Sequence, residues 1–77
     1  MSYNPQISEE LNILTRYNLK TTQEGVKIHS SAPQEVIDAA LRLFEKGLTS
    51  QADGGYLTEL GRKAAQHTQD LLLIMRG

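Results

Sequence analysis

The stretch GLTSQADGGYLTELG, residues 47–61, decides the fold of this 77-residue chain. Its centre, Ala-Asp-Gly-Gly at residues 52–55, contains Asp-Gly and Gly-Gly steps, which supply the positive φ angles that tight hairpins need. Because short runs of strand-compatible residues flank this turn, the stretch predicts a β-hairpin over about 48–57. Thr58 follows as a helix N-cap, and a last helix is expected over about 58–75.

Three helices are expected before the hairpin, and the one next to it carries the clearest signals. The segment Ser31-Ala32-Pro33-Gln34 combines a capping serine, a proline in the first turn and a glutamine at the capping-box position. These signals predict a helix over about 32–46, which Gly47 is well suited to end. Its buried face is predicted to consist of Val36, Ile37, Ala40, Leu41 and Phe44.

The N-terminal part of the chain predicts two more helices, the second with an alternative. Residues 1–7 are expected to form a flexible lead-in, and a first helix is expected over about 8–18. A capping box at residues 21–24 favours a short helix over about 22–29. Since the segment 25–29 begins with glycine and alternates like a strand, a strand there stays open as the alternative.

Composition places the chain among small globular proteins. Apolar residues make up 39% and charged residues 22% of the chain, which fits one domain, expected over 8–77. The absence of cysteine excludes a disulfide framework and favours the cytoplasm. The apolar run at residues 71–75 is too short to span a bilayer, and the N-terminus has no signal-peptide pattern, so no membrane association is expected.

The sequence carries no pattern that indicates catalysis, a cofactor or a metal. A metal site needs three or four convergent ligands, and His29 and His67 are the only histidines. Glu35 and Asp38 share a helix face, but paired carboxylates outside a pocket are usually solvated. There is no glycine-rich phosphate loop. We therefore expect a protein that is not an enzyme and has no cofactor and no metal.

The order helix, short helix, turn, helix, hairpin, helix predicts a mainly α fold with a two-stranded hairpin, of the winged helix-turn-helix class. The stretch RLFEKGL at residues 42–48 resembles the end of a recognition helix in MarR-type winged-helix regulators. The stretch YLTELGR at residues 56–62 resembles the segment that follows the wing in that superfamily. The whole chain also resembles a small bacterial family of uncharacterised proteins labelled DNA-binding proteins or transcriptional regulators. This resemblance implies binding to double-stranded DNA.

Eight polar side chains are candidates for contact with nucleic acid. A cluster at the predicted turn offers ammonium, imidazole and hydroxyl groups to phosphate, although for Ser31 helix capping is the competing role. Gln34 suits adenine, and Arg42 suits guanine or phosphate. Arg62 and Lys63 could touch a DNA backbone, or serve only as an exposed solubilising pair. The candidates are Lys27, His29, Ser30, Ser31, Gln34, Arg42, Arg62 and Lys63.

Charge gives the alternative to DNA binding. The net charge is −1, the predicted wing carries no basic residue, and Asp53 lies at its tip. The predicted outward face of the helix over 32–46 carries three acids and one base, and acids are repelled by phosphates. That face consists of Gln34, Glu35, Asp38, Arg42 and Glu45. These features favour a winged-helix protein–protein interaction module without DNA binding.

The apolar run at residues 71–75 is wider than one helical stripe. Consecutive helix positions cannot all face the same core, so part of this run is expected on the surface. We interpret it as a dimer or partner surface, in keeping with a homodimer, and the alternative is that the first helix covers it. The residues of this predicted surface are Leu71, Leu73, Ile74 and Met75.

Overall fold

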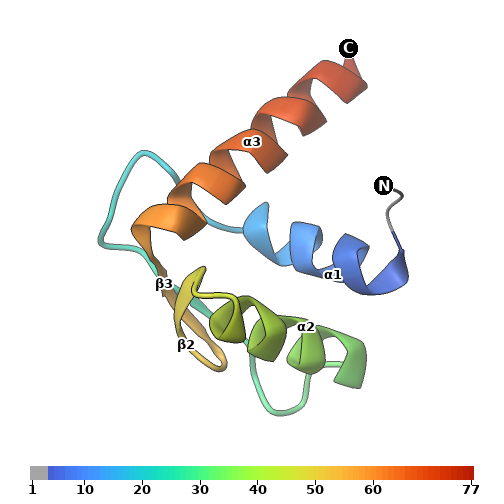
Figure 1. Ribbon diagram of the computed structural model, residues 1–77, viewed down its shortest axis with the longest axis vertical. Helices are drawn as coiled ribbons and strands as arrows, with labels where there is room; N and C mark the ends of the chain where they lie inside the picture. The colour runs from blue at the N-terminus through green and yellow to red at the C-terminus, as the bar shows by residue number, and fades with distance from the viewer. Residues whose placement is uncertain (1–3) are drawn as a thin grey trace.

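The computed structural model describes residues 4–77 and shows three helices around a small antiparallel sheet (Figure 1). The described part of the chain is therefore an α+β protein that is mainly helical. Its elements are α1 (Pro5–Leu14), β1 (Val26–Lys27), α2 (Gln34–Glu45), β2 (Thr49–Gln51), β3 (Gly54–Leu57) and α3 (Glu59–Arg76).

The predicted hairpin is confirmed as β2 and β3, but the sheet has a third strand. The strand order is β1-β3-β2, with both pairs antiparallel. Gly54 and Gly55 have φ angles of 115° and 77°, as the turn prediction requires. A Cβ at Gly54 would lie 2.3 Å from the Val26 carbonyl oxygen. The glycines therefore shape the turn and also let β1 approach β3.

The predicted helix over 22–29 is wrong, and the strand that stood as its alternative is present. Val26 pairs with Gly55, and the Ile28 amide donates to the Asp53 carbonyl over 2.8 Å. The Thr21 hydroxyl accepts from the Gln23 amide and forms a local turn instead of a capping box. Pairing with a preformed hairpin satisfies these backbone groups, whereas a helix of two turns has little stability of its own.

The first helix begins earlier and ends earlier than predicted. The Asn4 side chain accepts from the Ile7 amide over 2.8 Å, and Pro5 occupies the first turn. The expected lead-in is therefore wrong for residues 5–7, and residues 1–3 lie outside the described residues. Ser8, at which the helix was predicted to begin, lies inside the helix, which ends at Leu14 and not near residue 18.

The buried face of α2 is rotated by about one residue position from the predicted one. Ala39, Ala40 and Leu43 are buried, whereas Leu41 and Phe44 are each 42% exposed. The small side chain of Ala39 is fully buried and helps α1 to pack closely on this side. The prediction placed the bulkier Leu41 and Phe44 in the core. In the structure, the face of α2 that packs against the rest of the protein contains Ala39 and Ala40.

The core lies where α1, α2 and the start of α3 meet the sheet. Tyr17 is buried, and its hydroxyl donates to the Gly55 carbonyl over 3.1 Å, which joins the segment after α1 to the hairpin. None of the helices described for residues 4–77 is both long and apolar enough to cross a membrane. The buried apolar residues are Ile13, Leu14, Tyr17, Ile28, Ala39, Ala40, Leu43 and Ala65.

The junction between hairpin and α3 is closely packed. Thr58 caps α3 as predicted, because its Oγ1 accepts from the Gly61 amide over 3.0 Å. The same hydroxyl donates to the Gly47 carbonyl over 2.6 Å. A Cβ on Gly61 would lie 1.9 Å from the Leu48 carbonyl oxygen, so only glycine fits there. This junction sets the direction in which α3 leaves the sheet.

Candidate functional site

The turn cluster predicted for phosphate contact is only partly available. His29, Ser30 and Ser31 are exposed in the loop between β1 and α2. Ser31 does not cap α2, since Pro33 holds the N-cap position without a side-chain hydrogen bond. Lys27 forms an ion pair with Asp53 across the hairpin turn, 2.5 Å between Nζ and Oδ2. That hydrogen bond holds the pKa of the Asp53 carboxyl below its ordinary value.

The two candidates on α2 are engaged within the protein. Arg42 donates through Nε to Glu10 on α1 over 2.9 Å and through Nη2 to the Gln6 carbonyl over 3.2 Å. Gln34 donates to Asp38 over 2.8 Å. Arg42 therefore faces α1 and not outward, which corrects its predicted place on the exposed face.

Glu10 is the buried anion that holds Arg42, and no motif in the sequence indicated it. Glu10 is 5% exposed, and its carboxylate is shared between Arg42 on α2 and Lys46, which follows the last residue of that helix. Burial alone would raise the pKa of Glu10. The hydrogen bonds and positive charges of Lys46 and Arg42 outweigh burial and hold that pKa below its ordinary value. This cluster fixes α1 against α2.

Arg62 ties the start of α3 to the segment after α1. Its guanidinium donates to the Leu19 carbonyl over 2.7 Å and to the Thr21 carbonyl over 3.4 Å. Arg62 is partly buried, while its neighbour Lys63 is exposed. The sequence analysis predicted that Arg62 contacts DNA or only increases solubility. In the structure, Arg62 instead holds the start of α3 against the segment after α1.

One side of α2 carries an apolar stripe that sequence reasoning placed wholly in the core. Leu41 and Phe44 are exposed, whereas Ile37 is half-buried and packs against the core. Ile37, Leu41 and Phe44 follow one another at spacings of four and three residues, which puts them on one side of the helix. Ile37 also lines a hollow of about 340 Å³ between α2, β1 and the hairpin turn. Asp38 and Glu45, both exposed, lie beside the stripe. We call Ile37, Leu41 and Phe44 the α2 stripe.

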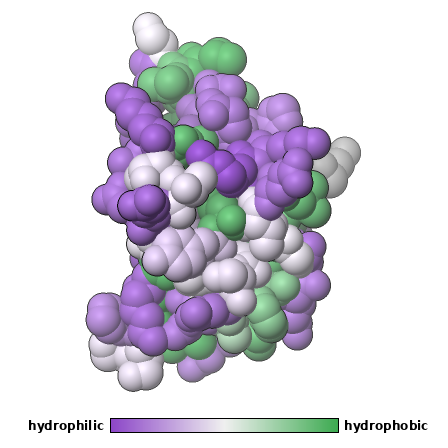
Figure 2. Space-filling view, turned by 90° about the vertical axis from the view of Figure 1, so that its left-hand side faces the viewer, coloured by the Kyte–Doolittle hydropathy of each residue, from purple (hydrophilic) through white to green (hydrophobic). Residues whose placement is uncertain are grey.

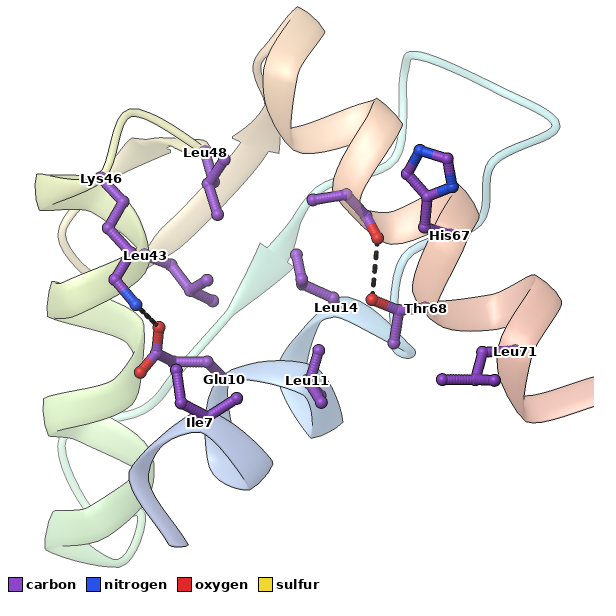
Figure 3. Close-up of a pocket in the computed structure, with 11 residues that line it drawn as sticks. Ile7, Glu10, Leu11, Leu14, Leu43, Lys46, Leu48, His67, Thr68 and Leu71 are labelled. Atoms are coloured by element: carbon purple, nitrogen blue, oxygen red, sulfur yellow. Dashed lines mark hydrogen bonds and ion pairs between the residues drawn. The ribbon is translucent and has the colours of Figure 1, made fainter. Parts of the chain in front are cut away.

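A second apolar surface lies between α1 and α3, where the two helices diverge (Figures 1 and 3). A groove of about 330 Å³ opens there, with the Glu10–Lys46 ion pair on one wall. Figure 3 shows side chains from α1, α2, α3 and the segment before β2 around it. Its apolar lining is formed by Ile7, Leu11, Leu14, Leu43, Leu48, Ala64 and Leu71.

The end of α3 continues this apolar surface beyond the groove. Leu71, Leu73, Ile74 and Met75 are 43%, 69%, 74% and 75% exposed. Figure 2 shows hydrophobic residues at the top of the molecule, where α3 ends. The alternative that the first helix covers the predicted surface is therefore wrong for the last three of these residues.

The described residues hold no cluster suited to a metal. Between residues 4 and 77, no group of three or more His, Cys, Asp or Glu side chains is arranged to hold a metal ion. Across the same residues, each buried side-chain nitrogen or oxygen has a hydrogen-bond partner. The described residues thus present two apolar surfaces, on α2 and between α1 and α3.

Comparison with known proteins assigns this α+β domain to a family. The chain belongs to the Family of unknown function (DUF5669), which matches residues 1–76. No curated protein and no solved structure matches the chain.

Proposed function

We propose that this chain is a winged-helix-like protein-interaction module that binds a helical segment of a partner protein through the α2 stripe. In this proposal the β2–β3 hairpin corresponds to the wing and α2 to the recognition helix. A helix-turn-helix needs a second helix just before the recognition helix, but the segment before α2 contains β1 instead. This difference favours a function other than DNA binding.

One observation carries the proposal: the face of α2 that points outward is apolar and acidic. Leu41 and Phe44 are each 42% exposed in the middle of that face. Major-groove readers place basic and amide side chains toward DNA, whereas a helix that packs against another helix presents apolar side chains at spacings of three and four residues. The α2 stripe has the second kind of spacing.

Charge defines the partner further. Asp38 and Glu45 border the stripe, while the α2 bases Arg42 and Lys46 are bound to Glu10 on the other side of the helix. A partner segment with Lys or Arg flanking its apolar positions would complement this rim and would be steered toward it. We therefore propose an amphipathic, basic helix as the ligand.

The test is a selection of helical peptides against the folded protein. A library of random peptides is first depleted on the Leu41→Asp variant and then selected on the wild-type protein. We expect enriched peptides with apolar residues at helical spacing and flanking Lys or Arg. Their affinity should fall about tenfold or more with Phe44→Ala, since central aromatic anchors dominate such interfaces.

The matched control is Gln23→Asp, which adds the same charge on the exposed loop before β1. This variant should bind the selected peptides like the wild type. The proposal is wrong if no peptide is enriched, or if the selected peptides move only amide signals of α1 and α3 in NMR spectra of labelled protein.

A second candidate function, DNA binding by a transcriptional regulator, is supported by the start of α3. Lys20 and Lys63 are both exposed and flank the contact between Arg62 and the segment after α1. Phosphate contacts there would give weak, strongly salt-dependent binding. Titration with a mixed-sequence duplex at low salt tests this candidate. Amide shifts at Lys20 and at the start of α3 around Lys63 support DNA binding, and a spectrum that the duplex leaves unchanged there excludes it.

A further inference from the structure

We infer that the groove between α1 and α3 binds the end of α3 from a second copy of this chain, which makes a symmetric homodimer. This inference concerns a different surface from the α2 stripe and does not depend on the proposed function. It rests on the shape of the groove, on the pattern of α3 and on the area that the two together offer.

The groove is continuous along α3. Its first part is the hollow of about 330 Å³ at Leu43 and Leu48. A second hollow of about 380 Å³ follows toward the end of the helix. Leu11, Thr68 and Leu71 line both hollows, so the two form one channel with α1 on one side and α3 on the other. An elongated channel of this kind accommodates a helix rather than a compact small molecule.

The end of α3 has the complementary shape and chemistry. Residues 73–77 are all exposed, so none of the other described residues, 4–72, covers the last turn of α3 (Figure 1). The groove side of α3 is uncharged from residue 64 to residue 75, and Arg76 follows at the end of the second hollow. The α3 residues that line the two hollows are Ala64, His67, Thr68, Leu71, Leu72, Met75 and Arg76, and the exposed Ile74 lies beside them. Such a stripe is suited to packing against another helix.

Groove and protruding end lie on the same side of the molecule, which is what a two-fold dimer requires. Two α3 helices that cross antiparallel at Leu71 place Thr68 opposite Ile74 of the second copy. The end of the second α3 then runs down the groove toward Ala64, and the first α3 does the same in return. Each copy supplies the same patch, so the interface is isologous and closed.

The available area matches a small stable dimer. Eleven residues line the first hollow and nine line the second, with three in common, so 17 different residues form the channel. Interfaces of standard size use about 20–30 residues and about 800 Å² from each partner. For a surface of 5390 Å², that area is about 15% of each copy. The channel together with Ile74 gives 18 residues, just below this range, so the interface would be a small one.

Charge selects this surface over the α2 stripe for self-association. Two α2 stripes would bring Asp38 and Glu45 of both copies together, and like charges at an interface oppose docking. The groove side of α3 has no acidic residue, and its one charged residue is Arg76 at the end of the second hollow. When two α3 helices cross antiparallel at Leu71, the two Arg76 side chains lie on opposite sides of the crossing. The net charge of −1 adds little repulsion between copies. The second copy therefore belongs in the groove.

The experiment measures association by sedimentation equilibrium over a wide range of protein concentration. We expect the wild type to reach twice the mass of one chain. Met75→Lys should weaken association by about tenfold or more, because it puts an unpaired charge into an apolar channel. Met75 is 75% exposed in one copy, so the variant should fold, and circular dichroism checks this. Ile74→Lys serves as a second variant.

The matched control is Leu73→Lys, since Leu73 is similarly exposed but lies about 160° around the helix from Met75. It should associate like the wild type. Isotope-filtered NMR on a mixture of labelled and unlabelled chains should show contacts between the Met75 methyl of one copy and Leu11 of the other. A wild type that stays monomeric overturns the inference. So does a dimer that Leu73→Lys dissociates and Met75→Lys leaves intact.

Discussion

The two halves of α3 belong to one helix but have opposite surroundings. At its start, Gly61 touches the backbone of Leu48, Thr58 binds the Gly47 carbonyl, and Arg62 binds the carbonyls of the segment after α1. At its end, Leu73, Ile74 and Met75 are at least 69% exposed. The first half is held mostly through backbone groups, and the second half offers mostly apolar side chains.

This contrast separates residues that define the fold from residues free to bind. Side chains in the first half of α3 contact backbone atoms, which cannot move aside when a side chain changes in size or shape. Substitutions in the first half should therefore lower the free energy of unfolding. Exposed side chains contribute little to stability, so substitutions at the end should alter association instead. Three substitutions in α3 test the contrast, and a fourth, at Glu10 on α1, gives a pH-dependent comparison with a buried ion pair elsewhere in the fold. They follow in order from the largest expected effect on stability to the smallest.

Gly61→Ala should have the largest effect on stability. The added Cβ would meet the Leu48 carbonyl oxygen at 1.9 Å, and a backbone atom cannot move aside as a side chain can. We expect the free energy of unfolding to fall by about 2–3 kcal/mol, despite the better helix propensity of alanine. Urea unfolding monitored by circular dichroism measures it. Lys63→Ala is the control, and equal stability of the two variants would contradict the contact.

Arg62→Ala should come next. It removes the hydrogen bonds to Leu19 and Thr21 and leaves partly buried carbonyls without a donor. The expected loss is about 2 kcal/mol, and Arg62→Lys should recover only part of it, because lysine cannot reach both carbonyls with one planar group. The same urea experiment applies. Unchanged stability of Arg62→Ala would mean that this side chain is free for another role.

Glu10→Gln should have a smaller effect that depends on pH. The carboxylate has a lowered pKa in the folded state, so its contribution is fully present above the ordinary value of 4.5 and is lost as the pH falls through the lowered one. We expect the variant to be less stable by about 1 kcal/mol near neutral pH, and the difference to vanish in acid. Urea midpoints across this pH range measure it.

The control for this pH dependence is Glu45→Gln, which changes an exposed carboxylate on α2. Its stability should differ little from that of the wild type at any pH. A difference between wild type and Glu10→Gln that grows on acidification would show that the sign of the pKa shift is wrong.

Leu73→Ser should have the smallest effect. Leu73 is 69% exposed, so its removal should change the free energy of unfolding by less than about 0.5 kcal/mol. The measurement is made at low protein concentration, where association does not add to stability. A loss comparable to that of Arg62→Ala would mean that the end of α3 is covered within one copy, and the contrast between the halves would fail.

The sequence predicted the fold best where one residue type had a single physical explanation. The glycines of the hairpin turn and the cap at Thr58 are of this kind, and both are confirmed. It failed at residues 22–29, where a capping pattern and a strand pattern overlapped. Pairing with β3 decided between them, and a contact between distant segments leaves no local signal.

The predicted sites failed for a different reason. Apolar residues occupy most positions from Val36 to Phe44, so the pattern alone could not choose which side of α2 faces the core. Once the face was misplaced, Arg42 was predicted outward although it binds Glu10. The run at residues 71–75 was easier, because too many adjacent apolar residues require some exposure whichever way the helix is turned.

The bond between Thr58 and the Gly47 carbonyl also bears on the order of folding. It joins residues 11 apart, whereas the bond between Arg62 and Leu19 joins residues 43 apart. Closing the longer loop costs about 1.2 kcal/mol more chain entropy. The hairpin and the start of α3 should therefore form first, and β1 should pair with β3 only afterwards. In hydrogen exchange, amides of the hairpin and of early α3 should become protected before those of β1.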